Sequence, residues 1–246
     1  MPVHKLLSFD IELSDVFDMK PGEGLEKYAP FNISVASTAI DGGEERLWFS
    51  TDADGEPSAN MARETAGQLL EYIREKQRQD YMACAWNGLS FDLRWIGHVA
   101  DARDLAAEAA LDSFDPMFQF FNQRGFPVGL AKVAEAMGVT GKTVMTGAAA
   151  PKHWQDGHHE LVMEYVMEDA RMTNAVVTQI MREKELRWVT QRGSLAREPM
   201  SVLKPVHQVL RDPKPDQSWM DGPIPREKFH QWIPAAVMQR IGRSGH

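Results

Sequence analysis

The chain has 246 residues, of which 43% are hydrophobic and 25% charged, the composition of a globular protein large enough for one substantial domain. Its single cysteine excludes an internal disulfide and a thiolate zinc cage, and no apolar run approaches the roughly 18 residues of a membrane-spanning helix. The first residues lack the apolar core of a signal peptide, so we expect a cytoplasmic protein.

Charge is distributed unevenly along the chain. The net charge is −8, yet residues 171–246 carry 13 Lys and Arg against 7 Asp and Glu. A basic carboxyl-terminal part can face a polyanion such as nucleic acid, or it can be an ordinary solvated surface. The sequence leaves these two interpretations open.

The first predicted element is a buried strand from Leu6 to Glu12. Side chains alternate between the two faces of a strand, so Asp10 and Glu12 share one face while Leu7, Phe9 and Ile11 point into a core. Two carboxylates on one rigid face suit a hard cation such as Mg²⁺ or Mn²⁺. The alternative is a strand that ends in solvent, where acids are harmless, and this short motif alone favours the alternative.

The following segments predict a sheet with helices on it. We expect a long loop over residues 13–30, and then strands over 31–39 and 46–49 that pair antiparallel through the Asp41-Gly42-Gly43 turn. Residues 60–78 show helical periodicity, and the unbroken apolar run 81–86 indicates a central strand. A crossover through this helix places the run parallel to the first strand. Ser90 is the expected N-cap of the helix that follows, with Asp92 in its first turn.

The second half of the chain is predicted to be mostly helical. Helices are expected over 102–110, 117–122 and 130–137, followed by a mobile loop over 138–157 and the longest helix from Glu160 to about Trp188. Seven prolines between 199 and 234 indicate an irregular tail, ordered against the domain by Trp219, Phe229 and Trp232. The fold class is therefore α/β, a mixed sheet flanked by helices.

Two further acids have predictable positions. Asp92 opens a helix at the sheet edge where the first strand ends, although an acid there can also simply complement the helix dipole. Tyr165 and Asp169 are four residues apart, on one face of the long helix, beside its apolar stripe. An acid beside a packing face is costly unless it is paired or binds a metal. Asp169 can also be an ordinary acid on the helix flank.

Together these segments resemble the DEDD superfamily of 3′–5′ exonucleases. Phe9-Asp10-Ile11-Glu12, Asn87 to Asp92, and Tyr165 to Asp169 are similar to its three motifs, in order and intact. Tyr165 matches the tyrosine branch, which includes the proofreading exonuclease domains of family B DNA polymerases. The histidine branch requires a histidine where this chain has Glu164.

The resemblance implies a fold and a division of the chain. The fold is the RNase H-like exonuclease fold, with a mixed five-stranded sheet flanked by helices. The exonuclease domain would comprise residues 1–187. Residues 188–246 would form an irregular, Pro-rich carboxyl-terminal extension docked on it.

The resemblance also implies hydrolysis with two divalent metal ions, Mg²⁺ or Mn²⁺. Nucleoside 5′-monophosphates would be released from single-stranded DNA or frayed 3′ ends. Asp10, Glu12, Asp92 and Asp169 would hold the metals and Tyr165 would orient the attacking water. Asn87, Phe91 and Leu13 would contact the substrate. The same chemistry on RNA ends and a catalytically inert nucleic-acid-binding module are the alternatives, and the oligomeric state is left open.

Overall fold

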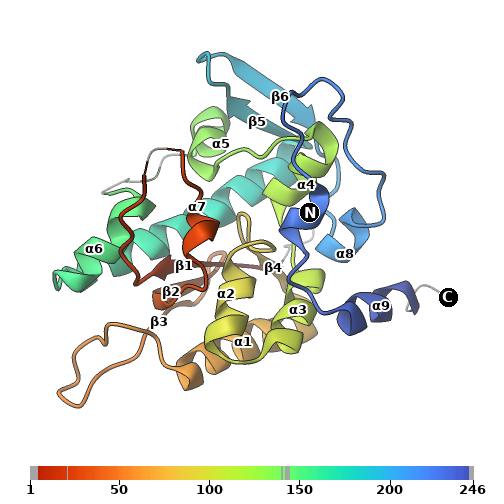
Figure 1. Ribbon diagram of the computed structural model, residues 1–246. Helices are drawn as coiled ribbons and strands as arrows, with labels where there is room; N and C mark the ends of the chain where they lie inside the picture. The colour runs from red at the N-terminus through yellow and green to blue at the C-terminus, as the bar shows by residue number, and fades with distance from the viewer. Residues whose placement is uncertain (1–4, 21, 140, 142–144, 244–246) are drawn as a thin grey trace.

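The computed structural model describes residues 5–20, 22–139, 141 and 145–243, and is built around a central sheet (Figure 1). Within these residues, β1 (Leu6–Leu13) pairs antiparallel with β2 (Ile33–Ile40) and parallel with β4 (Met82–Cys84). Strand β3 (Glu45–Trp48) continues the sheet beyond β2, giving the order β3-β2-β1-β4. The first strand is therefore interior, as the sequence predicts.

The two faces of β1 are covered by different helices. Its core-facing residues Leu7, Phe9 and Ile11 belong to a cluster that includes α1 (Arg63–Arg78), α2 (Asp92–Val99) and α3 (Arg103–Asp112). The opposite face is crossed by α7 (His159–Glu183), which packs on β1 and β2. Since side chains alternate, Asp10 and Glu12 lie on the α7 face.

Smaller elements surround this layered centre. They are η1 (Leu25–Tyr28), α4 (Pro116–Arg124), α5 (Leu130–Met137), η2 (Gly147–Ala149), α6 (Ala150–Gln155), β5 (Glu185–Val189), β6 (Leu195–Pro199), α8 (Val206–Val209), η3 (Arg226–Phe229) and α9 (Ala235–Arg243). Among the described residues, no helix is long and apolar enough to cross a membrane.

The fold class is confirmed, with one difference in the sheet. The described sheet has four strands where five were expected, and next to β4 Phe114 makes isolated bridges with Cys84 and Pro205. Asp115 caps α4 directly after this bridge, so the chain turns into a helix before a strand can extend.

Two other expectations were wrong. The expected loop 138–157 contains η2 and α6, although residues 140 and 142–144 lie outside the described part of the chain. The long helix ends at Glu183 and not near Trp188, because Lys184 adopts a left-handed conformation with φ 62°. The chain then forms the β5–β6 hairpin, in which Leu186 and Trp188 are both buried on the same face of β5.

The carboxyl-terminal segment is more ordered than expected. Besides the hairpin it contains α8, η3 and α9, and Phe229 and Trp232 are buried in the main core cluster. Trp219, by contrast, is 61% exposed and rests on Phe126. The division at residues 187 and 188 stays a prediction, and it falls within β5.

Candidate active site

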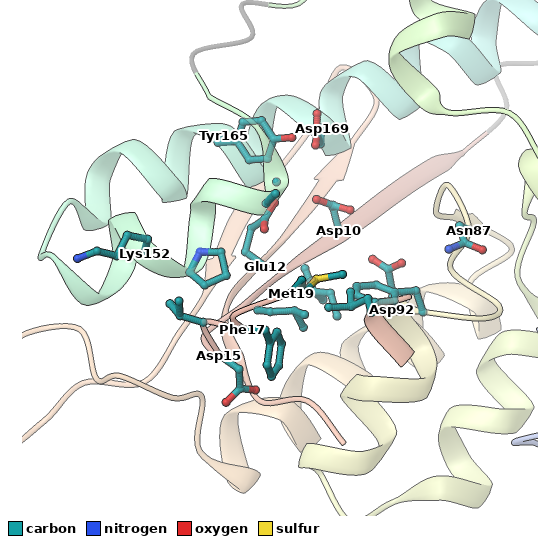
Figure 2. A pocket seen from close by; sticks show the side chains of 18 of the residues that line it. Asp10, Glu12, Asp15, Phe17, Met19, Asn87, Asp92, Lys152, Tyr165 and Asp169 are labelled. Atoms are coloured by element: carbon teal, nitrogen blue, oxygen red, sulfur yellow. The ribbon is translucent and has the colours of Figure 1, made fainter. Parts of the chain in front are cut away.

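Three carboxylates from β1 and α7 converge on one point. Oxygens of Asp10, Glu12 and Asp169 all lie within 4.8 Å of one another. Tyr165 lies one turn before Asp169 on α7, and its ring stands over the same space (Figure 2). The structure thus brings together four of the five predicted catalytic side chains.

Buried polar contacts hold α7 in this orientation. The Ser37 hydroxyl on β2 donates to the Val166 carbonyl at 2.7 Å, and the Asn174 side-chain amide donates to the Ala39 carbonyl at 2.9 Å. Between these anchors, the helical period turns Tyr165 and Asp169 toward β1. The helix and the sheet together therefore position the acids.

Asp92 approaches from the other side of the pocket. It is 2% exposed, it begins α2, and its carboxylate points toward Asp10 (Figure 2). It does not belong to the group whose oxygens lie within 4.8 Å. The expected N-cap role of Ser90 was wrong, because the Ser90 hydroxyl donates to Asn87 Oδ1 at 2.6 Å and Phe91 occupies the cap position.

The acids form one wall of a pocket of ≈ 500 Å³. The predicted substrate residues Asn87, Phe91 and Leu13 line it. Its other lining residues are mainly apolar and include Val16, Phe17, Met19, Leu25 and Pro151. The amino group of Lys152 points away from the carboxylates (Figure 2) and pairs with Asp156. The pocket therefore combines an acidic floor with an apolar side.

Burial and mutual repulsion make this site unfavourable for negative charge. Both effects raise the pKa values of Asp10 and Glu12 well above their ordinary range. Burial is also the main reason why the pKa of Asp92 rises to about 8 and that of Asp169 to about 6. Burial and the neighbouring acids raise the pKa of Tyr165 as well, so its hydroxyl keeps its proton at neutral pH.

The residues fit divalent metal ions. The donor set is all oxygen, which hard ions prefer, and its like charges need a counter-ion. Moreover, Oδ1 of Asp92 is buried, and within the described residues it has no hydrogen-bond partner. A buried carboxylate oxygen that faces other carboxylates and has no hydrogen-bond partner is available to bind a metal ion, which would supply the missing partner.

Gly147 at the start of η2 was not singled out from the sequence. A Cβ added there would lie 3.7 Å from the Tyr165 hydroxyl and 4.0 Å from Glu12 Oε1. The only sequence signal was the Gly- and Ala-rich composition of residues 138–157, which indicated a loop and no contact with the acids. The glycine leaves open the space beside the carboxylates.

A family model described as the RNase H superfamily matches residues 23–181, which is more than half of the chain. The protein belongs to the RNase H superfamily. The matched part of this RNase H superfamily member contains Asp92, Tyr165 and Asp169, whereas Asp10 and Glu12 precede it. A nuclease-type fold with an acidic cluster is therefore established, and the finer assignment is argued below.

A solved structure supports the same fold. The chain is similar to the family B DNA polymerase from the hyperthermophilic archaeon Pyrobaculum calidifontis, with a TM-score of 0.51 and 17% sequence identity. The similarity covers 73% of this RNase H superfamily member and 25% of the polymerase chain, so our protein spans about a quarter of that polymerase. At this identity the similarity shows the fold alone. A comparison with curated protein sequences finds no match.

Proposed function

We propose that the protein is a metal-dependent 3′–5′ exonuclease of the tyrosine branch of the DEDD superfamily. The observation that carries the proposal is the convergence of Asp10, Glu12 and Asp169 within 4.8 Å, with Tyr165 on the same face of α7. The three motifs of the resemblance thus come from distant parts of the chain and line one pocket.

The carboxylates would divide between two metal ions. Asp10, Glu12 and Asp169 would hold the first, and Asp10 with Asp92 would hold the second. When bound, divalent ions neutralise the acids and stabilise charge on the attacking and leaving oxygens of a phosphodiester displacement. The resulting positive field would also draw phosphate into a pocket that is otherwise strongly acidic.

Tyr165 would position the attacking water and would not take its proton. Burial and the neighbouring acids raise the pKa of the phenol, so at neutral pH it keeps its proton and can donate a hydrogen bond. Its hydroxyl is directed toward Asp169 (Figure 2). Water would attack the terminal phosphorus and the bond to the 3′ oxygen of the shortened strand would break. That oxygen takes up a proton, and a nucleoside 5′-monophosphate is released.

The apolar side of the pocket suits a terminal nucleobase. Val16 and Met19 are 50% and 42% exposed and lie on the loop that follows β1. Phe17 packs against Tyr28 at 5.0 Å between ring centroids, which stiffens the loop. Aromatic side chains such as Phe17 can stack on any base and the aliphatic ones pack on its face, so we propose single-stranded or frayed 3′ ends as the substrate, with little preference for sequence.

The proposal is tested with 5′-labelled single-stranded DNA and RNA of one sequence, incubated with Mg²⁺ or Mn²⁺. The wild-type protein should shorten DNA into a ladder, and Asp10→Asn should not. A ladder on RNA alone would move the assignment to RNA ends. No shortening of either strand, or equal shortening by Asp10→Asn, would reject the enzyme.

A further inference from the structure

The backbone of Leu89 is held at both its N–H and its carbonyl by distant parts of the chain. Its N–H donates to the Asp115 carboxylate at 3.1 Å, and its carbonyl accepts from the Trp232 indole at 2.7 Å. Leu89, Asp115 and Trp232 are 1%, 3% and 6% exposed. Both contacts are thus made away from water, where losing a partner leaves a buried polar group unpaired.

Leu89 lies in the short loop that delivers Asp92 to the pocket. Asn87 in this loop has φ 71°, a left-handed conformation that is unusual for a residue other than glycine. Its backbone N–H donates to Asp115 at 3.1 Å. The Leu93 N–H donates to the Gly88 carbonyl at 3.1 Å, which joins the loop to the first turn of α2. A shift of the loop would therefore move Asp92.

Asp115 connects this loop to α4. The carboxylate oxygen that accepts from Asn87 also accepts from Phe118 at 3.0 Å and caps the helix, while the other oxygen accepts from Leu89. Burial raises the pKa of Asp115 to about 6, and four backbone donors, those of Phe118, Leu89, Asn87 and Met117, oppose the rise. One buried side chain thus serves both the loop and the helix.

Trp232 connects the same loop to the carboxyl-terminal segment. Its own carbonyl accepts from Arg103 Nε at 2.7 Å, which fixes Trp232 against α3. The segment that follows β6 therefore reaches the loop beneath the pocket, although Trp232 does not line the pocket itself. Packing alone would explain why the indole is buried, but it would not require the indole N–H to donate a hydrogen bond to the Leu89 carbonyl.

We infer that Asp115 and Trp232 are positioning residues that clamp the backbone of Leu89, one at its N–H and one at its carbonyl, and thereby hold Asp92 at the site. The inference rests on the proposed function for its catalytic consequence. It gives the carboxyl-terminal segment a role in the activity, because a partner of the loop comes from residues beyond 188. Removing either partner should loosen the loop while the rest of the fold remains.

A role through charge alone would have the opposite sign. Asp115 and Asp92 are both buried acids, and the negative charge of Asp115 repels the Asp92 carboxylate. Removing that charge would relieve the repulsion and strengthen cation binding. The clamp instead requires weaker cation binding, since Asp92 would no longer be held in place.

Asp115→Asn separates the clamp from the helix cap. An Asn side chain has one acceptor oxygen, which can still accept the hydrogen bonds from the backbone N–H groups of Phe118 and Asn87. Asn also caps helices as well as Asp does. Its NH₂ group then faces the Leu89 N–H, so that hydrogen bond is lost. Trp232→Phe keeps an aromatic ring and removes only the indole donor.

The experiment measures amide hydrogen exchange over residues 86–92 and Mn²⁺ binding by calorimetry without substrate, together with kcat and KM on single-stranded DNA. Both variants should exchange about tenfold faster in this segment and bind Mn²⁺ about tenfold or more weakly. Their kcat should fall by a similar factor while KM changes less. Two variants are controls. Trp48→Phe removes an indole that donates to the Thr38 hydroxyl at 3.0 Å. Gln119→Ala removes the side chain that donates to the Val202 carbonyl and accepts from the Lys204 N–H.

Unchanged exchange in the segment, or Mn²⁺ binding that stays equal or tightens in Asp115→Asn, would overturn the clamp. Equal losses of Mn²⁺ affinity in the two controls would also overturn it, because they would indicate a general effect of destabilisation. A wild-type protein that degrades no nucleic acid would reject the proposed exonuclease, while exchange and calorimetry would still decide the clamp.

Discussion

The Ser37 hydroxyl of β2 donates a 2.7 Å hydrogen bond to the Val166 carbonyl, which lies between Tyr165 and Met167 on α7. The two residues are 129 positions apart. This contact crosses the interface between the sheet and the helix, at the level where Asp169 meets Asp10 and Glu12. The geometry of this carboxylate cluster therefore depends on the register of α7 over β2.

Ser37→Ala should lower the free energy of unfolding by about 1 kcal/mol, the usual net value of one hydrogen bond, and should reduce exonuclease activity several-fold. Ser50→Ala is the control outside the pocket, where the Ser50 hydroxyl hydrogen-bonds the Thr65 hydroxyl at 2.8 Å and accepts from the Ala62 N–H at 2.8 Å. Chemical denaturation and initial rates measure both effects. Equal activity loss in the two variants would show that the register contact is unimportant.

Metal should stabilise the protein, and more so at higher pH. Burial, together with charged neighbours, raises the pKa of Asp92 to about 8 and of Asp169 to about 6 from an ordinary 3.8. The folded protein then binds more protons than the unfolded chain, so stability without metal is fully present below pH 3.8 and declines as pH rises through 6 and 8.

Mn²⁺ at about 100 times its Kd should add about 2.7 kcal/mol of stability, with a larger rise in Tm at pH 8 than at pH 6. Asp10→Asn removes a repelling charge, so without metal this variant should melt at a higher temperature than the wild type and gain less from Mn²⁺. Thermal melts with EDTA or Mn²⁺ make the comparison. Identical melts in the two conditions would count against a metal centre.

The phenol of Tyr165 should matter for turnover and not for metal binding. Tyr165→Phe removes the hydroxyl that is directed at the acids while keeping the ring, so kcat should fall by roughly 10²-fold. Its Mn²⁺ stabilisation should match the wild type within error. A variant that loses metal binding and activity in parallel would instead assign Tyr165 a role in holding the site together.

Gly147 should be intolerant of a branched side chain. A Cβ at this position meets Tyr165 at 3.7 Å and Glu12 at 4.0 Å, so Gly147→Val would extend into the space beside the acids. Activity should fall at least 10²-fold, an amount typical of a misplaced catalytic group, with little change in Tm. Gly67→Ala, at an open position in α1, is the control and should be fully active. Full activity of Gly147→Val would show that this space is not used.

Much of this site was predictable from sequence because its main residues follow local periodicities. Alternation along β1 placed Asp10 and Glu12 together, and the helical turn placed Tyr165 with Asp169. The clamp on Leu89 was not predictable, since it joins side chains 26 and 143 residues away from Leu89 through backbone groups that any sequence possesses. Lys184 likewise ended α7 by adopting a left-handed conformation, which a lysine does not signal.

The central claim is most directly tested by identifying the first product released from a single strand labelled on its 3′-terminal nucleotide. In the presence of Mg²⁺ or Mn²⁺, the wild-type protein should release that label as a nucleoside 5′-monophosphate, with no labelled oligonucleotide before it. Asp10→Asn and Glu12→Gln should release none. Labelled oligonucleotides as the first product, or release of the label by the variants at the wild-type rate, would contradict the account.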